Sequence, residues 1–290
     1  MMLEHSYEAL IDAGINPKIL RRKNTAIIVA VTYFEAQKIL LYRDIQVHGK
    51  NLTGCAKNIA ANLISHWLDV KEPSVVIDAA CSSGVHAIAV GQSYIKSGQC
   101  EDALILGTNL CLTYPMTLQF ARLGVLSPTG RCRPFDRKAN GYCRSETIAA
   151  IYLQKAKHAK RNYATCKHIK LNSDGYKDEG ITFPSKYAQK VLLTEFYAEC
   201  GNMSAKDLDY IEAHGTGTIA GDPQEIDAIC NALCKDKKSS LLIGSVKSNL
   251  GHSESSSTFK RMLNLPVLSL LLLSQLTLQP LIEIKNASPE

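Results

Sequence analysis

Apolar and polar segments alternate along the chain in a way that predicts strands and helices in turn. Two short runs are almost entirely apolar, at residues 25–31 and 102–107, and such runs are typical of buried strands in a parallel sheet. Apolar residues at helical spacing predict helices over 4–13, 58–66, 146–159 and 186–199, and a further strand is predicted at 168–172. This alternation indicates an α/β fold, with a mostly parallel sheet and helices on its faces.

A third apolar run, Val75–Ile77, leads to Cys81 through small residues, and a helical pattern follows from Val85 to Ile95. This order predicts a strand, a sharp turn and a helix, with Cys81 at the turn. The N-terminus of a helix favours the thiolate, so the segment resembles a nucleophile elbow with cysteine in place of serine. Taken alone, a free cysteine is more often a small buried hydrophobic residue.

Two later segments each place a histidine beside glycine after a short apolar run. His214 lies in Glu-Ala-His-Gly-Thr-Gly-Thr, and His252 ends Lys-Ser-Asn-Leu-Gly-His. A lone histidine more often has a structural role. Two histidines in glycine-rich loops, however, strengthen the interpretation of Cys81 as a nucleophile. Together the three residues form a Cys/His/His set that suits acyl transfer.

These three segments resemble the β-ketoacyl synthase (ketosynthase) domain of animal-type fatty acid synthases and related polyketide synthases. Asp-Ala-Ala-Cys-Ser-Ser is similar to the nucleophile motif of that family, and the two histidine motifs follow in the family's order. The resemblance covers residues 3–256. It implies a thiolase-like fold of two similar α/β halves, layered α-β-α-β-α, in a homodimer.

The resemblance also implies a reaction. Cys81 would take an acyl chain from the phosphopantetheine of an acyl carrier protein. Malonyl carrier would then lose carbon dioxide, while His214 and His252 stabilise the enolate, and attack on the acyl thioester would release a 3-oxoacyl product. Neither a metal nor a directly bound cofactor is expected, because the substrates arrive as malonyl and acyl thioesters on the carrier.

Further positions match the family's site. Thr216 and Thr218 would hold the pantetheine arm, although turn capping explains two such threonines nearly as well. Lys247 would support the histidine network, where an unassigned lysine would be placed on the surface. Asp222 and Glu225 are expected to anchor the loop and to cap the following helix.

The chain also departs from the family. It is expected to be truncated at both ends, with a partial ketosynthase domain over 1–257, an incomplete second half and a divergent apolar tail over 258–290. The family's late Gly-Phe-Gly-Gly loop, which supplies an oxyanion donor, is not found in it. The chain is therefore either an acyltransferase that condenses, expected to be weak in isolation, or a catalytically inactive fragment of a synthase. A cysteine protease is a distant third interpretation.

Composition changes this picture little. The chain has 290 residues, 46% hydrophobic and 21% charged, with a net charge of +6, as is ordinary for a globular protein. Basic clusters at 21–23 and 235–238 are expected to be solvated surface or, failing that, to meet an acidic carrier protein. No nucleic-acid motif is present.

The ten cysteines suggest no disulfide framework, because the chain shows no secretory signal, and the cytoplasm is the expected location. Cys230 and Cys234 are expected on one helix, packing in a core rather than binding zinc. The apolar stretch 263–278 is shorter than a membrane span needs and is expected to be a core helix.

Overall fold

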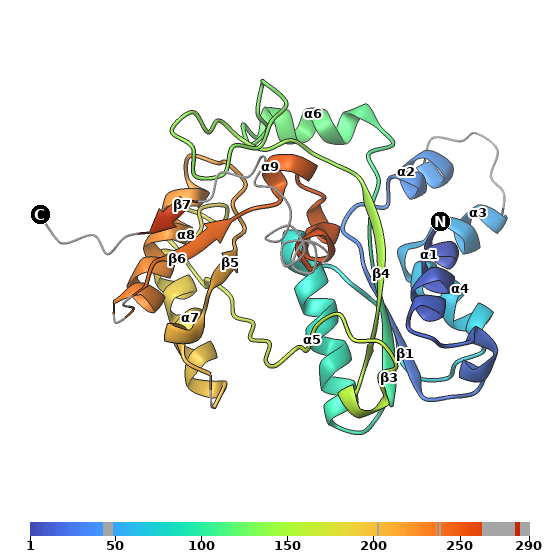
Figure 1. Cartoon of the computed structure of the whole chain (residues 1–290). Helices are drawn as coiled ribbons and strands as arrows, with labels where there is room; N and C mark the ends of the chain where they lie inside the picture. The colour runs from blue at the N-terminus through green and yellow to red at the C-terminus, as the bar shows by residue number, and fades with distance from the viewer. Residues whose placement is uncertain (43–48, 202, 236, 238, 263–281, 285–290) are drawn as a thin grey trace, which may run out of the picture. The chain divides into compact units, whose positions relative to one another are not determined.

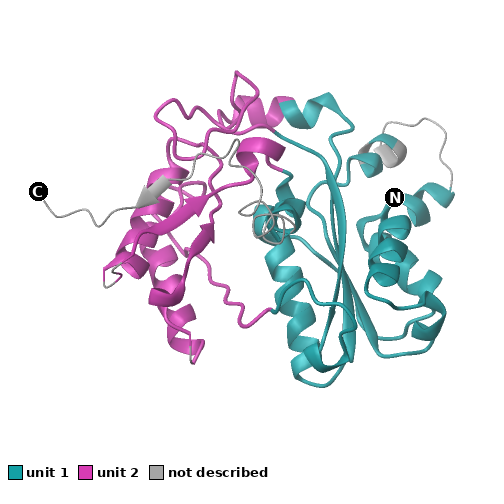
Figure 2. Ribbon diagram, in the orientation of Figure 1, with its two compact units in different colours: residues 1–117, 144–165, 253–266 teal, residues 118–143, 166–252, 267–290 magenta. Residues whose placement is uncertain are grey.

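The computed structural model describes residues 1–42, 49–201, 203–235, 237, 239–262 and 282–284. The chain divides into two compact units (Figure 2). Unit 1 consists of residues 1–117, 144–165 and 253–266, and unit 2 consists of residues 118–143, 166–252 and 267–290. Each unit has its own sheet and its own hydrophobic core.

The sheet of unit 1 has four strands in the order β2-β1-β3-β4. The central strand β1 (Thr25–Ala30) pairs in parallel with β2 (Ser74–Ile77) and with β3 (Asp102–Asn109). The edge strand β4 (Thr147–Gln154) pairs with β3 in the antiparallel direction. The predicted parallel sheet is thus present, with one antiparallel edge.

Helices cover both faces of this sheet (Figure 1). Side chains of α1 and α4 pack with Ile27, Val29, Leu104 and Leu106 on one face, and α5 covers the other. The helical segments of unit 1 include α1 (Met2–Asp12), α2 (Glu35–Tyr42), α3 (Gly49–Cys55), α4 (Lys57–Leu68) and α5 (Ser83–Lys96), with the short turns η1 (Pro17–Leu20), η2 (Ala80–Ser82), η3 (Ala156–His158) and η6 (Glu254–Ser256). Helix α6 (Tyr114–Arg122) runs from unit 1 into unit 2.

Unit 2 contains a three-stranded sheet in the order β5-β6-β7. Strand β5 (Tyr210–Glu212) is parallel to β6 (Leu241–Gly244), and β7 (Ile282–Ile284) is antiparallel to β6. The remaining elements of this unit are α7 (Lys186–Glu199), η4 (Ala205–Asp207), α8 (Gly221–Ile229), η5 (Cys230–Cys234) and α9 (Lys247–Leu250). Apolar side chains from β5, β6, α7, α8 and η5 form its core.

Two sequence predictions of secondary structure are wrong. The segment 146–159, predicted as a helix, forms strand β4 and the turn η3, because an eight-residue antiparallel ladder with β3 outweighs the helix propensity of its alanines. No strand forms at 168–172. There His168 and Lys170 bind the carboxylate of Glu199 in α7 instead. The predicted helices at 4–13, 58–66 and 186–199 and the strands at 25–31 and 102–107 are confirmed.

The structure also bears on what the sequence predicted for the basic clusters and for the cysteines. Lys237, from one of the predicted basic surface clusters, is instead buried and donates to the carbonyls of Lys206 and Leu208 at 2.8 and 2.7 Å. Cys230 and Cys234 lie on the same helical segment, and Cys234 packs in the core of unit 2, as predicted. All ten cysteines lie in described positions, and each is a free thiol.

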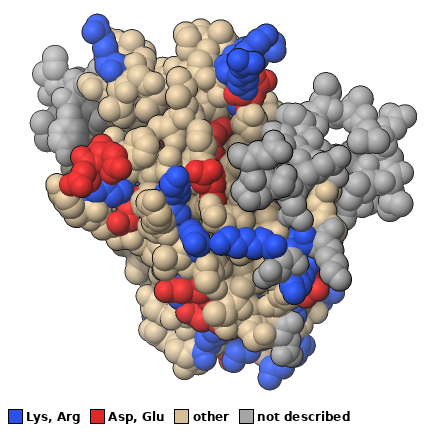
Figure 3. Space-filling model, turned by 90° about the vertical axis from the view of Figure 1, so that its left-hand side faces the viewer, with Lys and Arg blue, Asp and Glu red and all other residues tan. Residues whose placement is uncertain are grey.

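Charges of both signs are interspersed on the face shown in Figure 3, with wide uncharged areas between them. The apolar stretch 263–278 lies outside the described residues, so the predicted core helix there is not observed. Among the helices that are described, none has the length and apolar character to cross a membrane.

Candidate active site

Cys81 lies in the turn η2, between the end of β2 and the start of α5, so the predicted strand, turn and helix are confirmed. The preceding residue, Ala80, has a φ of +48°, in the left-handed region that costs a residue with a Cβ atom about 1–2 kcal/mol. The hydroxyl of Ser83 holds this backbone by accepting from the N–H of Ala79 at 2.8 Å and donating to the carbonyl of Ala80 at 2.6 Å. The turn is therefore strained and held by a buried side chain.

A second segment of unit 1, which contains Ser257 and Thr258, packs against the turn that holds Cys81. The hydroxyl of Ser257 donates to the carbonyl oxygen of Cys81 at 3.2 Å. A Cβ atom added to Gly84, in the first turn of α5, would lie only 2.7 Å from the Cβ of Thr258, so glycine is what allows the approach. The segment around Ser257 and Thr258, where the predicted resemblance to the family ends, thus packs directly against the nucleophile turn.

This supporting segment is held by a buried ion-pair network. The guanidinium of Arg144 donates to Glu254 at 2.5 Å and to Glu35 at 3.2 Å, and all three side chains are less than 5% exposed. Glu35 also accepts from the N–H and the hydroxyl of Thr113. Burial raises the pKa of Glu254, and its contact with Arg144 opposes that rise. The network joins four separate segments of unit 1, and removing one partner would leave a buried charge uncompensated.

In unit 2, the loop that carries His214 is anchored by two charged side chains. Glu225 accepts from the backbone N–H groups of His214 and Gly215 at 2.6 and 2.8 Å. Lys247, which is 1% exposed, donates from Nζ to the carbonyl of His214 at 2.7 Å. The prediction that Glu225 anchors the loop is confirmed, and Lys247 is a buried lysine tied to the histidine backbone rather than a surface residue.

His252 faces His214 across a short distance. The two imidazole centroids are 5.5 Å apart with the rings nearly perpendicular, at 89°. His252 is buried, its N–H donates to the carbonyl of Cys143 at 2.7 Å, and its ring lies 4.9 Å from that of Tyr142. Two imidazoles at this separation can both donate hydrogen bonds to one oxygen atom that gains negative charge.

The threonines lie in the same loop. Thr216 is buried, and its hydroxyl lies 3.2 Å from that of Thr218, which also accepts from the N–H of Gly221 at 3.2 Å. Asp222 accepts from the N–H groups of Phe135 and Gly217 at 2.8 and 3.1 Å. Burial raises the pKa of Asp222, and these backbone donors oppose the rise.

Asp222 therefore anchors the loop, as predicted. The predicted helix cap is not formed, because α8 already begins at Gly221 and its N-cap, Ala220, makes no side-chain capping bond.

The structure thus gathers five of the six predicted site residues, namely His214, His252, Thr216, Thr218 and Lys247, within unit 2, while Cys81 lies in unit 1. Sequence reasoning missed Ser257 and the network of Glu35, Arg144 and Glu254. Arg144 stands in a stretch that matches the family, but no local signal marks Glu35. Within the described ranges, no group of three His, Cys, Asp or Glu residues could hold a metal ion.

Models of two protein domains match almost the whole chain. The model of the β-ketoacyl synthase N-terminal domain matches residues 1–159, and that of the C-terminal domain matches residues 163–284. A fatty acid synthase of Anser anser anser is 42% identical over 257 residues, which are 89% of this chain and 73% of that sequence. The compactin diketide synthase of Penicillium citrinum is 38% identical over 261 residues, which are 89% of this chain and 10% of that relative.

Solved structures show the same fold. The oxazolomycin ketosynthase domain of Streptomyces albus superposes with a TM-score of 0.83 and 31% identity, over 92% of this chain and 48% of that one. The ketosynthase from module 6 of the bacillaene synthase of Bacillus subtilis superposes with a TM-score of 0.81, over 92% of this chain and 46% of that one. The fold is thiolase-like, and the chain spans about half the length of these ketosynthases. The chain belongs to the β-ketoacyl synthase family, whose ketosynthase domains condense acyl units in fatty acid and polyketide synthases.

Proposed function

We propose that this chain carries the condensing site of a fatty acid synthase. Its reaction is the decarboxylative Claisen condensation of an acyl thioester on Cys81 with malonyl-carrier protein, giving 3-oxoacyl-carrier protein. The observation that carries the proposal is the perpendicular pair of His214 and His252 imidazoles in a chain of this family. Lys247 binds the backbone carbonyl of His214, and the backbone N–H of His252 donates to the carbonyl of Cys143.

In the first half-reaction, the Cys81 thiolate attacks the carbonyl carbon of an acyl-phosphopantetheine thioester. The new carbon–sulfur bond forms as the carrier thiolate leaves and takes a proton, so the acyl group passes between two sulfur atoms without oxidation or reduction. The strained Ala80 and the hydrogen bond from Ser257 hold the peptide of Cys81 during this attack.

In the second half-reaction, malonyl-carrier protein enters and loses carbon dioxide. The electron pair of the broken carbon–carbon bond becomes an enolate, whose oxygen accepts hydrogen bonds from His214 and His252. The enolate carbon attacks the acyl thioester on Cys81, and the thiolate of Cys81 leaves as the 3-oxoacyl thioester departs on the carrier. The order is ping-pong, since one acyl group is bound covalently before the second substrate reacts.

The partners follow from this chemistry. The hydroxyls of Thr216 and Thr218 suit the amides of the pantetheine arm that delivers both substrates. An acyl carrier protein is the macromolecular partner, and a homodimer is the expected assembly. Free thiols throughout the chain fit a reducing compartment such as the cytoplasm.

The test separates the two half-reactions in the purified chain. Malonyl-carrier protein is supplied with and without an acyl thioester, and carbon dioxide and 3-oxoacyl product are both measured. His214→Ala and His252→Ala are expected to lower decarboxylation by about 100-fold or more while leaving acylation of Cys81 within a few-fold of wild type.

Cys81→Ala serves as the control, because it removes acyl transfer and leaves the histidine pair in place. Equal loss of both half-reactions in the histidine variants would contradict the roles proposed here. Acylation of Cys81 without any decarboxylation in the wild-type chain would identify an acyl-binding fragment instead of a condensing enzyme.

A further inference from the structure

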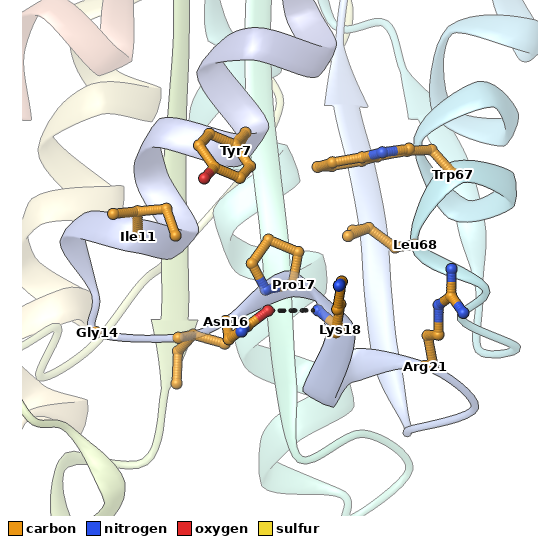
Figure 4. A pocket seen from close by; sticks show the side chains of 10 residues that line it. Tyr7, Ile11, Gly14, Asn16, Pro17, Lys18, Arg21, Trp67 and Leu68 are labelled. Atoms are coloured by element: carbon orange, nitrogen blue, oxygen red, sulfur yellow. Dashed lines mark hydrogen bonds between the residues drawn. The ribbon is translucent and has the colours of Figure 1, made fainter.

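A groove lies on the surface of unit 1, between α1, η1 and α4 (Figure 4). Its volume is about 560 Å³, within the range of ligand sites in proteins. Tyr7 and Ile11 of α1 form one side, Trp67 of α4 stands at the other, and Pro17 lies between them. The two helices therefore present apolar walls to an open space.

These walls are unusually exposed for apolar side chains. Tyr7 and Ile11, one helical turn apart, are 51% and 48% exposed, and Trp67 is 39% exposed. The core of unit 1 is filled by other residues of the same helices, such as Leu10 and Ile64, so the groove side chains are not needed there. Burying such apolar surface favours association, and a patch of this kind is typical of an interaction site.

The groove also carries uncompensated positive charge. Lys18 and Arg21 line it, and neither side chain forms an ion pair or a hydrogen bond with any residue that the structure describes. Two acidic residues of α1 pair with other groups instead of with Lys18 or Arg21. Glu8 contacts His5 at 2.8 Å, and Asp12 contacts Arg161 at 2.6 Å. An occupant that brings acidic side chains next to apolar ones would match this arrangement.

The position in the sheet separates this groove from the nucleophile. Strands β1 and β2 are parallel, and Cys81 follows the C-terminal end of β2. The groove residues of η1 precede the N-terminal end of β1, and Trp67 and Leu68 precede that of β2. The groove therefore lies at the opposite end of the sheet from Cys81, where no reacting acyl group would be held.

We propose that this groove docks an amphipathic helix of a partner polypeptide, with apolar side chains one turn apart and acidic residues beside them. Helices commonly bind in this way, by laying an apolar face into a groove whose charged rim selects the partner. The inference does not depend on the condensing activity.

The experiment uses a chance feature of the chain, since Trp67 is its only tryptophan. A displayed library of random 16-residue peptides is selected on the whole chain, and the enriched peptides are then titrated while the Trp67 emission is recorded. The K18E/R21E double variant is the test protein. K96E/K138E, with two exposed lysines outside the groove, is the matched control with the same change in net charge.

The proposal predicts that enriched peptides carry Asp or Glu beside apolar residues at helical spacing and shift the Trp67 emission to the blue. Their Kd should rise at least about tenfold in K18E/R21E and change less than about twofold in K96E/K138E. Selection of peptides without an acidic bias, or equal affinity for both double variants, would overturn the proposal. So would an emission shift caused only by phosphatidylserine vesicles, which would mark a lipid-binding surface.

Discussion

Ser257 donates a hydrogen bond from its hydroxyl to the carbonyl oxygen of Cys81, over 3.2 Å. The nucleophile turn thus depends on a residue 176 positions later in the chain, in the segment that follows His252. Ser257→Ala should remove this bond, whose net value is about 1 kcal/mol, and slow acylation of Cys81 about fivefold. The rate is measured with a short acyl thioester in single-turnover reactions.

Ser256→Ala provides the matched control for Ser257→Ala. The neighbouring hydroxyl of Ser256 is buried and has no hydrogen-bond partner in the described part of the chain, so its loss should leave acylation unchanged and stability equal or higher. Similar slowing in the two variants would show that the hydroxyl of Ser257 has no specific role in positioning Cys81.

The left-handed backbone of Ala80 makes a prediction about stability. Ala80→Gly relieves a left-handed strain of about 1–2 kcal/mol but adds entropy to the unfolded chain, whereas Ala79→Gly, at a φ of −135°, adds only the entropy. Ala80→Gly should therefore be more stable than Ala79→Gly by about 1 kcal/mol in urea unfolding. Equal stability of the two variants would show that the turn stores no strain.

Lys247 and Lys237 are two buried lysines of unit 2 that donate to backbone carbonyls, and only Lys247 binds the carbonyl of His214. Both Lys247→Met and Lys237→Met should lower the free energy of unfolding. Only Lys247→Met should lower malonyl decarboxylation per folded molecule, by about tenfold or more. If Lys237→Met lowers decarboxylation as strongly, the effect of Lys247 is general destabilisation.

Asp222 predicts a pH dependence of stability. Burial raises its pKa in the folded protein, so the unfolded chain releases this proton at lower pH than the folded one. The stability that Asp222 contributes is thus fully present below the ordinary aspartate pKa of about 4 and is lost as the pH rises through the higher native value. In urea unfolding, wild type should lose stability relative to Asp222→Asn over this window, and a relative gain would contradict the assignment.

Local patterns in the sequence predicted most of unit 1 correctly. The run at 25–31 is almost entirely apolar because β1 is buried on both faces, and in unit 2 the helix predicted at 186–199 matches α7 in full. The failure at 146–159 has a physical cause. Its four alanines and its apolar spacing suit a helix, yet Thr147–Gln154 forms an edge strand because β3 offers a complete antiparallel partner, which no local pattern reveals.

For the candidate site, too, the sequence predicted local features but not the long-range contacts. Motifs placed Cys81 at a turn and the two histidines in glycine-rich loops, and the structure adds the 5.5 Å separation of His214 and His252. Contacts between residues far apart in the sequence remained hidden. Arg144 meets Glu254 across 110 positions, and Lys247, which composition alone would place on the surface, is buried beneath His214.

Mass spectrometry of the whole chain after incubation with an acyl thioester, beside Cys81→Ala, tests the central claim most directly. The account predicts one acyl adduct, located on the peptide that contains Cys81 and missing from the variant, because the strained turn presents this thiol for attack on the thioester. No adduct on a folded wild-type chain, or the same adduct level in Cys81→Ala, would contradict the assignment of Cys81 as the nucleophile.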